Sequence, residues 1–249
     1  MKRAFPILAV LTALLLAYAF YEALWVAPME RTMGDVQRIF YYHVPSAWTA
    51  FLLFFVNLVA SVVYLIRKST KADAVALVSA EVGVVFCTVV LVTGPIWARP
   101  VWGIWWTWDI RLTTTLVLWL IYVSYLVLRR FSDSSQTPTL AAVLAIFGAL
   151  DVPLVYFSIW FFRTQHPQPV IGGGGSIDPR MLHVLLINWL AFSCFAFLVC
   201  WWRYQLELLK RDLEEAQALE ALLGSEGLPA TSGRAKLPLK KTQSRSGTM

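Results

Sequence analysis

The amino-acid sequence predicts an all-α membrane protein with six transmembrane helices, both termini in the cytoplasm, and an external tryptophan-rich segment at the membrane interface. Of its 249 residues, 58% are hydrophobic and only 14% are charged, which excludes an ordinary soluble domain. Six apolar runs approach the ~20 residues that a helix needs to cross a bilayer. The basic residues lie near the ends of these runs and in the C-terminal tail, so the net charge of +6 does not indicate nucleic-acid binding.

The apolar runs follow one another with little sequence between them. We expect residues 1–202 to form one transmembrane domain, and residues 203–249 to form a cytoplasmic helical extension and a disordered tail. The first run follows Lys2 and Arg3 and lacks a small-residue cleavage site, so we interpret it as an uncleaved span. The fourth run is short, and its helix can extend into the tryptophan-rich segment before it. The expected spans are residues 4–26, 45–66, 74–96, 113–128, 139–162 and 179–202.

Two of these spans carry recognisable helix-start signals. Pro45 is typical of a first helical turn, and Asp178 followed by Pro179 is an N-cap and first-turn pair. Two carboxyl groups lie inside apolar runs, Glu81 in the third span and Asp151 in the fifth. Each is either functional or packed against a neighbouring helix, and the sequence leaves both alternatives open.

The distribution of Lys and Arg gives the orientation. Fifteen of them lie at the N-terminus, in segments 67–71 and 129–136, and after Trp202, whereas the other three connecting segments hold six. Because cytoplasmic segments carry the excess of basic residues, the larger set marks the cytoplasm. The tryptophan-rich segment is therefore expected on the outer side.

That segment runs from Trp97 to Thr113, WARPVWGIWWTWDIRLT, and holds five of the chain's twelve Trp residues. It is too interrupted by charged residues, Pro and Gly to be a clean span, and an indole ring suits the membrane interface, where its N–H stays hydrated. If Pro100 begins a short helix, one face of that helix is an aromatic wall with a carboxylate at its end. The residues on this face would be Trp102, Trp105, Trp106 and Asp109.

An aromatic wall of this kind has two interpretations. It either anchors the segment among lipid headgroups or forms a platform for a flat, apolar ligand with polar edges, for which a porphyrin is the obvious candidate. The chain has three His residues: His43 and His166 lie in the outer segments on either side of the platform, and His183 lies inside the start of the sixth span. Imidazole is an axial ligand of haem iron, so His43 and His166 are the candidate iron ligands and His183 is an ordinary helix residue.

The two propionates of a haem suit Arg side chains. Arg38, Arg99 and Arg111 lie nearest to the His and Trp motifs. Asp109 cannot pair with a propionate, and we expect it to orient Arg111, a Trp N–H or a His tautomer. The chain has no CxxCH motif, so it is not itself a c-type cytochrome, and no nucleotide-binding loop, so it is not by itself an ATP-driven pump. It also has no Ser-His-Asp or paired-carboxylate arrangement, which favours a subunit without catalytic activity but leaves the question open.

The motif WGIWWTWDIRLT resembles the tryptophan-rich WWD signature of haem-handling membrane proteins. Together with LVTGPIWARPVWG, it most resembles the haem exporter protein C (CcmC) family of cytochrome c maturation, from about residue 36 to residue 182. YYHVPS and RTQHPQ resemble the two His motifs of that family, so the resemblance implies haem b with axial ligands His43 and His166. The expected haem contacts are Trp97, Arg99, Trp102, Trp105, Trp106, Trp108, Asp109, Arg111 and Arg38.

The resemblance also implies a function. It predicts a multi-pass subunit of the bacterial cytoplasmic (inner) membrane that presents haem on its periplasmic face to a periplasmic haem chaperone (CcmE-like). The implied partners are ABC-transporter subunits (CcmA/CcmB-like) and a small membrane subunit (CcmD-like). Two alternatives remain open. One is a cytochrome c synthase-type subunit, against which the RLT after Asp109 and the short chain argue. The other is a b-type electron-transfer cytochrome, which would hold haem between His residues buried inside the spans.

Overall fold

Helices make up the regular structure of the chain, as the apolar runs predict. The computed structural model describes residues 4–132, 134–162, 164–167 and 177–225. Within them, six helices are long and apolar enough to cross a membrane and no strand forms, which confirms the fold class. The predicted disordered tail lies largely outside the described residues. The elements are α1 (Ala4–Tyr21), η1 (Glu22–Val26), η2 (Asp35–Ile39), α2 (Phe40–Arg67), α3 (Thr70–Trp102), α4 (Ile110–Phe131), α5 (Thr137–Phe161) and α6 (Pro179–Ser225).

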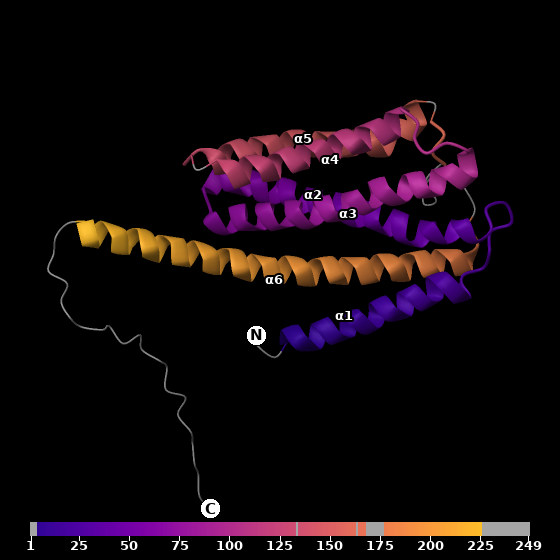
Figure 1. The fold of residues 1–249 in the computed structure, drawn as a ribbon, viewed down its shortest axis with the longest axis horizontal. Helices are drawn as coiled ribbons and strands as arrows, with labels where there is room; N and C mark the ends of the chain where they lie inside the picture. Colours follow the sequence, from indigo (N-terminus) through magenta and orange to yellow (C-terminus); the bar gives the residue numbers. More distant parts are fainter. Residues whose placement is uncertain (1–3, 133, 163, 168–176, 226–249) are drawn as a thin grey trace, which may run out of the picture. The chain divides into compact units, whose positions relative to one another are not determined.

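Helices α2, α3, α4 and α5 form the central bundle (Figure 1). The rings of Phe54 in α2 and Tyr122 in α4 stack at 3.9 Å between centroids, and both side chains are fully buried. Gly83 in α3 permits this packing, because a Cβ there would lie 2.7 Å from the Phe54 ring. The chain divides into two compact units, residues 1–208 and 209–249, and the whole bundle belongs to the first.

The first part of α6 packs on the bundle through specific side-chain contacts. Asn188 donates a hydrogen bond to the backbone oxygen of Ala19 in α1 at 3.2 Å. Arg203 forms two hydrogen bonds with Glu81 in α3, at 2.8 and 2.9 Å. Glu81 is therefore half of an ion pair between two helices, which answers one of the questions that the sequence left open. Asp151 is buried and one of its carboxyl oxygens has no hydrogen-bond partner among the described residues.

Two helix boundaries differ from the sequence expectation in a way that matters for the site. Helix α2 begins at Phe40 and not at Pro45, because the 3-10 turn η2 leads directly into it. Helix α3 does not end at residue 96 but continues through Pro95 and Pro100 to Trp102. A proline removes one backbone hydrogen bond, and a transmembrane helix tolerates this loss when its neighbours cover the freed carbonyl.

The predicted short helix that begins at Pro100 is therefore wrong. Pro100 lies in the last turn of α3, and Gly103 ends the helix in the left-handed conformation, with φ +78°. Its N–H donates to the backbone oxygen of Arg99 at 3.0 Å, as in a glycine C-cap. The chain then runs without regular structure as far as Asp109, the N-cap of α4. Trp102, Trp105 and Trp106 consequently do not share one helical face.

Candidate haem-binding cavity

A cavity of about 230 Å³ lies where α2 begins, α3 ends, α4 begins and α5 ends. Its wall continues several turns into the bundle, to Phe51 of α2 and Cys87 of α3. The site is thus set into the end of the bundle and does not rest on an open interfacial segment. Besides Phe51 and Cys87, its polar, aromatic and thioether lining residues are Met33, His43, Trp97, Trp102, Trp106, Arg111, Thr115, Gln165 and His166.

His43 lies in the first turn of α2, and not in a loop as the sequence suggested. Only 7% of the residue is exposed. Its Nδ1 lies 2.8 Å from the hydroxyl oxygen of Thr93 in α3, and its ring meets the edge of Trp97 at 5.8 Å between centroids. The remaining ring nitrogen, Nε2, is therefore the one available to a ligand in the cavity.

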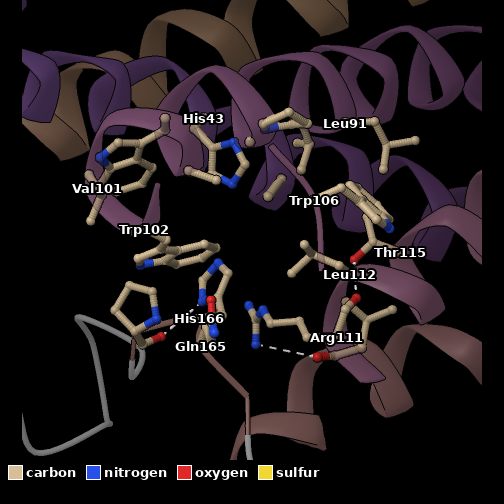
Figure 2. Close-up of a pocket in the computed structure, with 18 of the residues that line it drawn as sticks. His43, Leu91, Val101, Trp102, Trp106, Arg111, Leu112, Thr115, Gln165 and His166 are labelled. Atoms are coloured by element: carbon tan, nitrogen blue, oxygen red, sulfur yellow. Dashed lines mark hydrogen bonds between the residues drawn. The ribbon is translucent and has the colours of Figure 1, made fainter. Parts of the chain in front are cut away.

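His166 approaches the same cavity from the segment after α5, and the close-up shows the two imidazoles on opposite sides of the space (Figure 2). Its Nδ1 lies 2.9 Å from the backbone oxygen of Pro167. A carbonyl oxygen only accepts, so Nδ1 carries the proton and Nε2 keeps its lone pair. Burial lowers the pKa of His166 to about 4, and the positive charge of Arg111 adds to the effect, so the ring is neutral at pH 7.

The five Trp residues of the motif separate into two groups. Trp97, Trp102 and Trp106 line the cavity, whereas Trp105 and Trp108 are 59% and 76% exposed. The indole nitrogens of Trp97 and Trp106 are buried and have no hydrogen-bond partner among the described residues. A buried N–H without an acceptor is costly, so these two groups are donors that a bound molecule can satisfy.

Arg111 is the one of the three candidate Arg residues that lines the cavity. Its guanidinium donates to the backbone oxygens of Val155 and Tyr156 in α5 at 3.3 and 3.4 Å, which leaves further N–H groups toward the cavity (Figure 2).

The other two Arg residues are engaged in local contacts. Arg38 donates to Asp35 and to the backbone oxygen of Ala23, both at 3.0 Å. Arg99 donates to the backbone oxygen of Gly103.

Within the part of the chain that the structure describes, Asp109 makes no hydrogen bond to Arg111, a Trp N–H or a His, although its negative charge acts on both Arg111 and His166. Its Oδ1 accepts a hydrogen bond from the backbone N–H of Leu112 at 3.0 Å, and its Oδ2 accepts one from the Thr107 hydroxyl at 3.2 Å. It is the N-cap of α4. The carboxylate thereby fixes where α4 begins, and Arg111 follows two residues later.

The donor set fits a haem. Two neutral imidazoles with free Nε2 atoms suit the iron, the indole and guanidinium N–H groups suit carboxylates, and apolar and aromatic walls suit the porphyrin plane. His183 is exposed and does not line the cavity. Sequence reasoning missed Thr93 and Met33. The LVTG sequence that contains Thr93 stands next to the motif, but nothing in the sequence indicated its partner.

Comparison with known proteins identifies the family of the chain. The family model of "Heme exporter protein C" (CcmC) matches residues 1–219. The chain is 35% identical over 222 residues to "Heme exporter protein C" of Bradyrhizobium diazoefficiens, covering 88% of this chain and 84% of the relative. It is 33% identical over 195 residues to the protein of the same name in Escherichia coli K12, covering 78% and 77%. A "Putative cytochrome c biosynthesis ccmC-like mitochondrial protein" of Marchantia polymorpha is 35% identical over 185 residues, covering 74% and 78%.

Proposed function

The chain belongs to the haem exporter protein C family of cytochrome c biogenesis, and we propose that its cavity binds haem b as cargo for delivery to a periplasmic haem chaperone. The observation that carries the proposal is the pair of imidazoles on one cavity. His43 and His166 come from opposite ends of the central bundle's sequence, yet both line this space and both have Nδ1 engaged elsewhere. They would be the axial ligands, through Nε2.

The remaining polar groups would hold the propionates. The Arg111 guanidinium has its position set by two carbonyls of α5, so it can offer its other N–H groups in a fixed direction. The indole N–H groups of Trp97 and Trp106 would supply two more donors. Trp102 and the apolar side chains of α3 would contact the porphyrin plane.

Delivery requires that the site open on the side of the acceptor. The fifteen-to-six distribution of Lys and Arg supports an arrangement with the cavity at the periplasmic face of the cytoplasmic membrane and both termini inside. Reporter fusions after residue 173 and after Ser134 should then report opposite sides. A cytoplasmic signal from the fusion after residue 173 would reverse the orientation.

The exposed pair Trp105 and Trp108 lies in the same segment as the cavity residue Trp106 and is free for another protein. Exposed aromatic side chains are frequent anchors of protein interfaces. We assign this pair to the contact with the haem chaperone (CcmE-like). The ATP-driven part of the system would come from ABC-transporter subunits (CcmA/CcmB-like), together with a small membrane subunit (CcmD-like).

The test is to co-express the chaperone and to measure haem on both proteins. In Trp105→Ala/Trp108→Ala, haem on this chain should stay normal while haem on the chaperone falls. Trp25→Ala is the matched control, because Trp25 is also exposed, at 65%, but lies in η1, outside the tryptophan-rich segment. Normal loading of the chaperone by the double variant would show that the two indoles are membrane anchors only.

A further inference from the structure

Thr93 connects the backbone of α3 to the imidazole of His43. Its hydroxyl oxygen lies 2.6 Å from the backbone oxygen of Val89, one turn earlier in the same helix, and 2.8 Å from His43 Nδ1. The hydroxyl has one proton, so it can donate to only one of these two atoms. The atom that accepts this proton, the Val89 oxygen or His43 Nδ1, determines the tautomer of His43.

The shorter contact settles the direction. The Val89 oxygen can only accept, and at 2.6 Å it takes the hydroxyl proton. The Thr93 oxygen then accepts from His43, which places the imidazole proton on Nδ1 and leaves Nε2 unprotonated.

Thr88, in the same helix, shows the same arrangement with an unambiguous partner. Its hydroxyl lies 2.7 Å from the Val84 backbone oxygen and accepts a hydrogen bond from the indole nitrogen of Trp119 at 2.8 Å. An indole N–H can only donate, so the hydroxyl proton of Thr88 must go to the helix carbonyl. The two threonines therefore share one geometry, and in each a ring N–H donates to the hydroxyl oxygen.

The surroundings of His43 hold its ring in place. A Cβ on Gly94 would lie 3.4 Å from His43 Cε1, so α3 passes close to the ring at this glycine. Trp97 meets it edge-on from the next turn. The contact with Thr93 engages Nδ1, and because His43 lines the cavity, Nε2 is the ring nitrogen left for a ligand there.

We propose that Thr93 is a positioning residue that locks His43 in the Nδ1–H tautomer, so that its Nε2 lone pair faces the ligand cavity. Its consequence for haem rests on the proposed function, because only a ligand to iron needs that lone pair. The same hydrogen bond increases the basicity of Nε2, as outer partners of metal-bound His residues generally do. Loss of the hydrogen bond should therefore make Nε2 a weaker ligand and allow His43 to adopt both tautomers.

The first readout needs no haem. In a His166→Gln/His183→Gln background, His43 is the only imidazole, and ¹⁵N-labelled His in detergent reports which ring nitrogen carries the proton. The chain with Thr93 should show a protonated Nδ1 and a bare Nε2. Thr93→Val, which removes the acceptor at nearly constant volume, should show a mixture of tautomers, and Thr93→Ser should restore the original signal.

The second readout is haem affinity, titrated into haem-free protein with all three His residues. Thr93→Val should bind haem about 10- to 100-fold more weakly, the range found for outer partners of metal ligands, and Thr93→Ser should recover most of the loss. Thr88→Val is the matched control, because it removes the same kind of bond from the same helix away from the cavity. If Thr93→Val does not accumulate, Thr93→Cys has a similar size and a much weaker acceptor and carries the same expectation.

The possible failures are distinguishable. An unchanged tautomer in Thr93→Val, or an affinity equal to that of Thr88→Val, would overturn the role of Thr93. If instead His43→Ala binds haem as tightly as the parent chain, the proposed ligand is wrong, and the tautomer measurement still decides what Thr93 does.

Discussion

Replacing Asp109 separates two explanations of the acidic residue in the WWD motif. In the structure its carboxylate is the N-cap of α4 and, among the described residues, forms no hydrogen bond with His43 or His166. Asparagine caps a helix about as well as aspartate, because its side-chain oxygen accepts the same backbone N–H, and serine does nearly the same. We therefore expect Asp109→Asn and Asp109→Ser to bind haem like the parent chain and Asp109→Ala to bind it less well.

The size of the effect follows from the two hydrogen bonds. Loss of a helix cap costs about 0.5–2 kcal/mol, typically ~1 kcal/mol, and the Thr107 hydroxyl loses its acceptor as well. In a chain of this size, ~1 kcal/mol corresponds to a Tm shift of roughly 2–4 °C. The first turn of α4 would also fray, and the backbone that carries Arg111 would no longer support the two hydrogen bonds that its guanidinium makes with α5.

The assay compares thermal unfolding and bound haem in detergent for all three variants. Asp178→Ala is the matched control, since Asp178 accepts a backbone N–H at the start of α6 at 2.8 Å and does not line the cavity. It should lose comparable stability and keep its haem. If Asp109→Asn loses as much haem as Asp109→Ala, the negative charge matters and the capping argument is refuted.

Three further outcomes follow from the structure. Asp73→Ala should destabilise the bundle by about 3–5 kcal/mol, because the Arg129 side chain is only 10% exposed and would lose its bidentate partner at 2.6 and 2.7 Å. Denaturant or thermal unfolding measures this loss, and a stability close to that of the parent chain would contradict it. His166 in the haem-free chain should titrate near pH 4 by NMR and not near its ordinary value of about 6.5. Since the folded state then binds fewer protons than the unfolded chain between these values, lowering the pH through this window should reduce stability, and the loss should be smaller in His166→Gln. Trp106→Ala should reduce bound haem and Trp108→Ala should not, because only the first lines the cavity; equal haem content in the two would contradict the separation.

The parts of the fold that could be predicted are those governed by lipid. A membrane requires long apolar helices, so hydropathy and the positions of Lys and Arg were sufficient to predict six spans. The end of α3 could not be found this way, since Pro100 is compatible with both a helix start and a kinked helix interior. Gly103 and Asp109 are ordinary C-cap and N-cap residues, and they would have placed the break correctly.

The candidate site was predictable in composition but not in geometry. His43, His166 and Arg111 stood out because imidazole and guanidinium groups flank an aromatic segment, and all three line the cavity. Which Trp residues point inward depends on the path of the chain after Gly103, which no helical period describes. The role of Thr93 depends on a partner fifty residues away in the sequence, and only the packing of α2 on α3 brings them together.

The central claim is that His43 and His166 together hold haem in the end of this bundle. The most direct test is the haem content per polypeptide and the visible spectrum of the purified chain in three single variants. His43→Ala and His166→Ala should each lose haem or the spectrum of a six-coordinate, bis-imidazole iron, whereas His183→Ala, whose side chain lies outside the cavity, should retain both. Retention of a parental spectrum by His43→Ala or His166→Ala, or loss of haem from His183→Ala alone, would contradict the assignment.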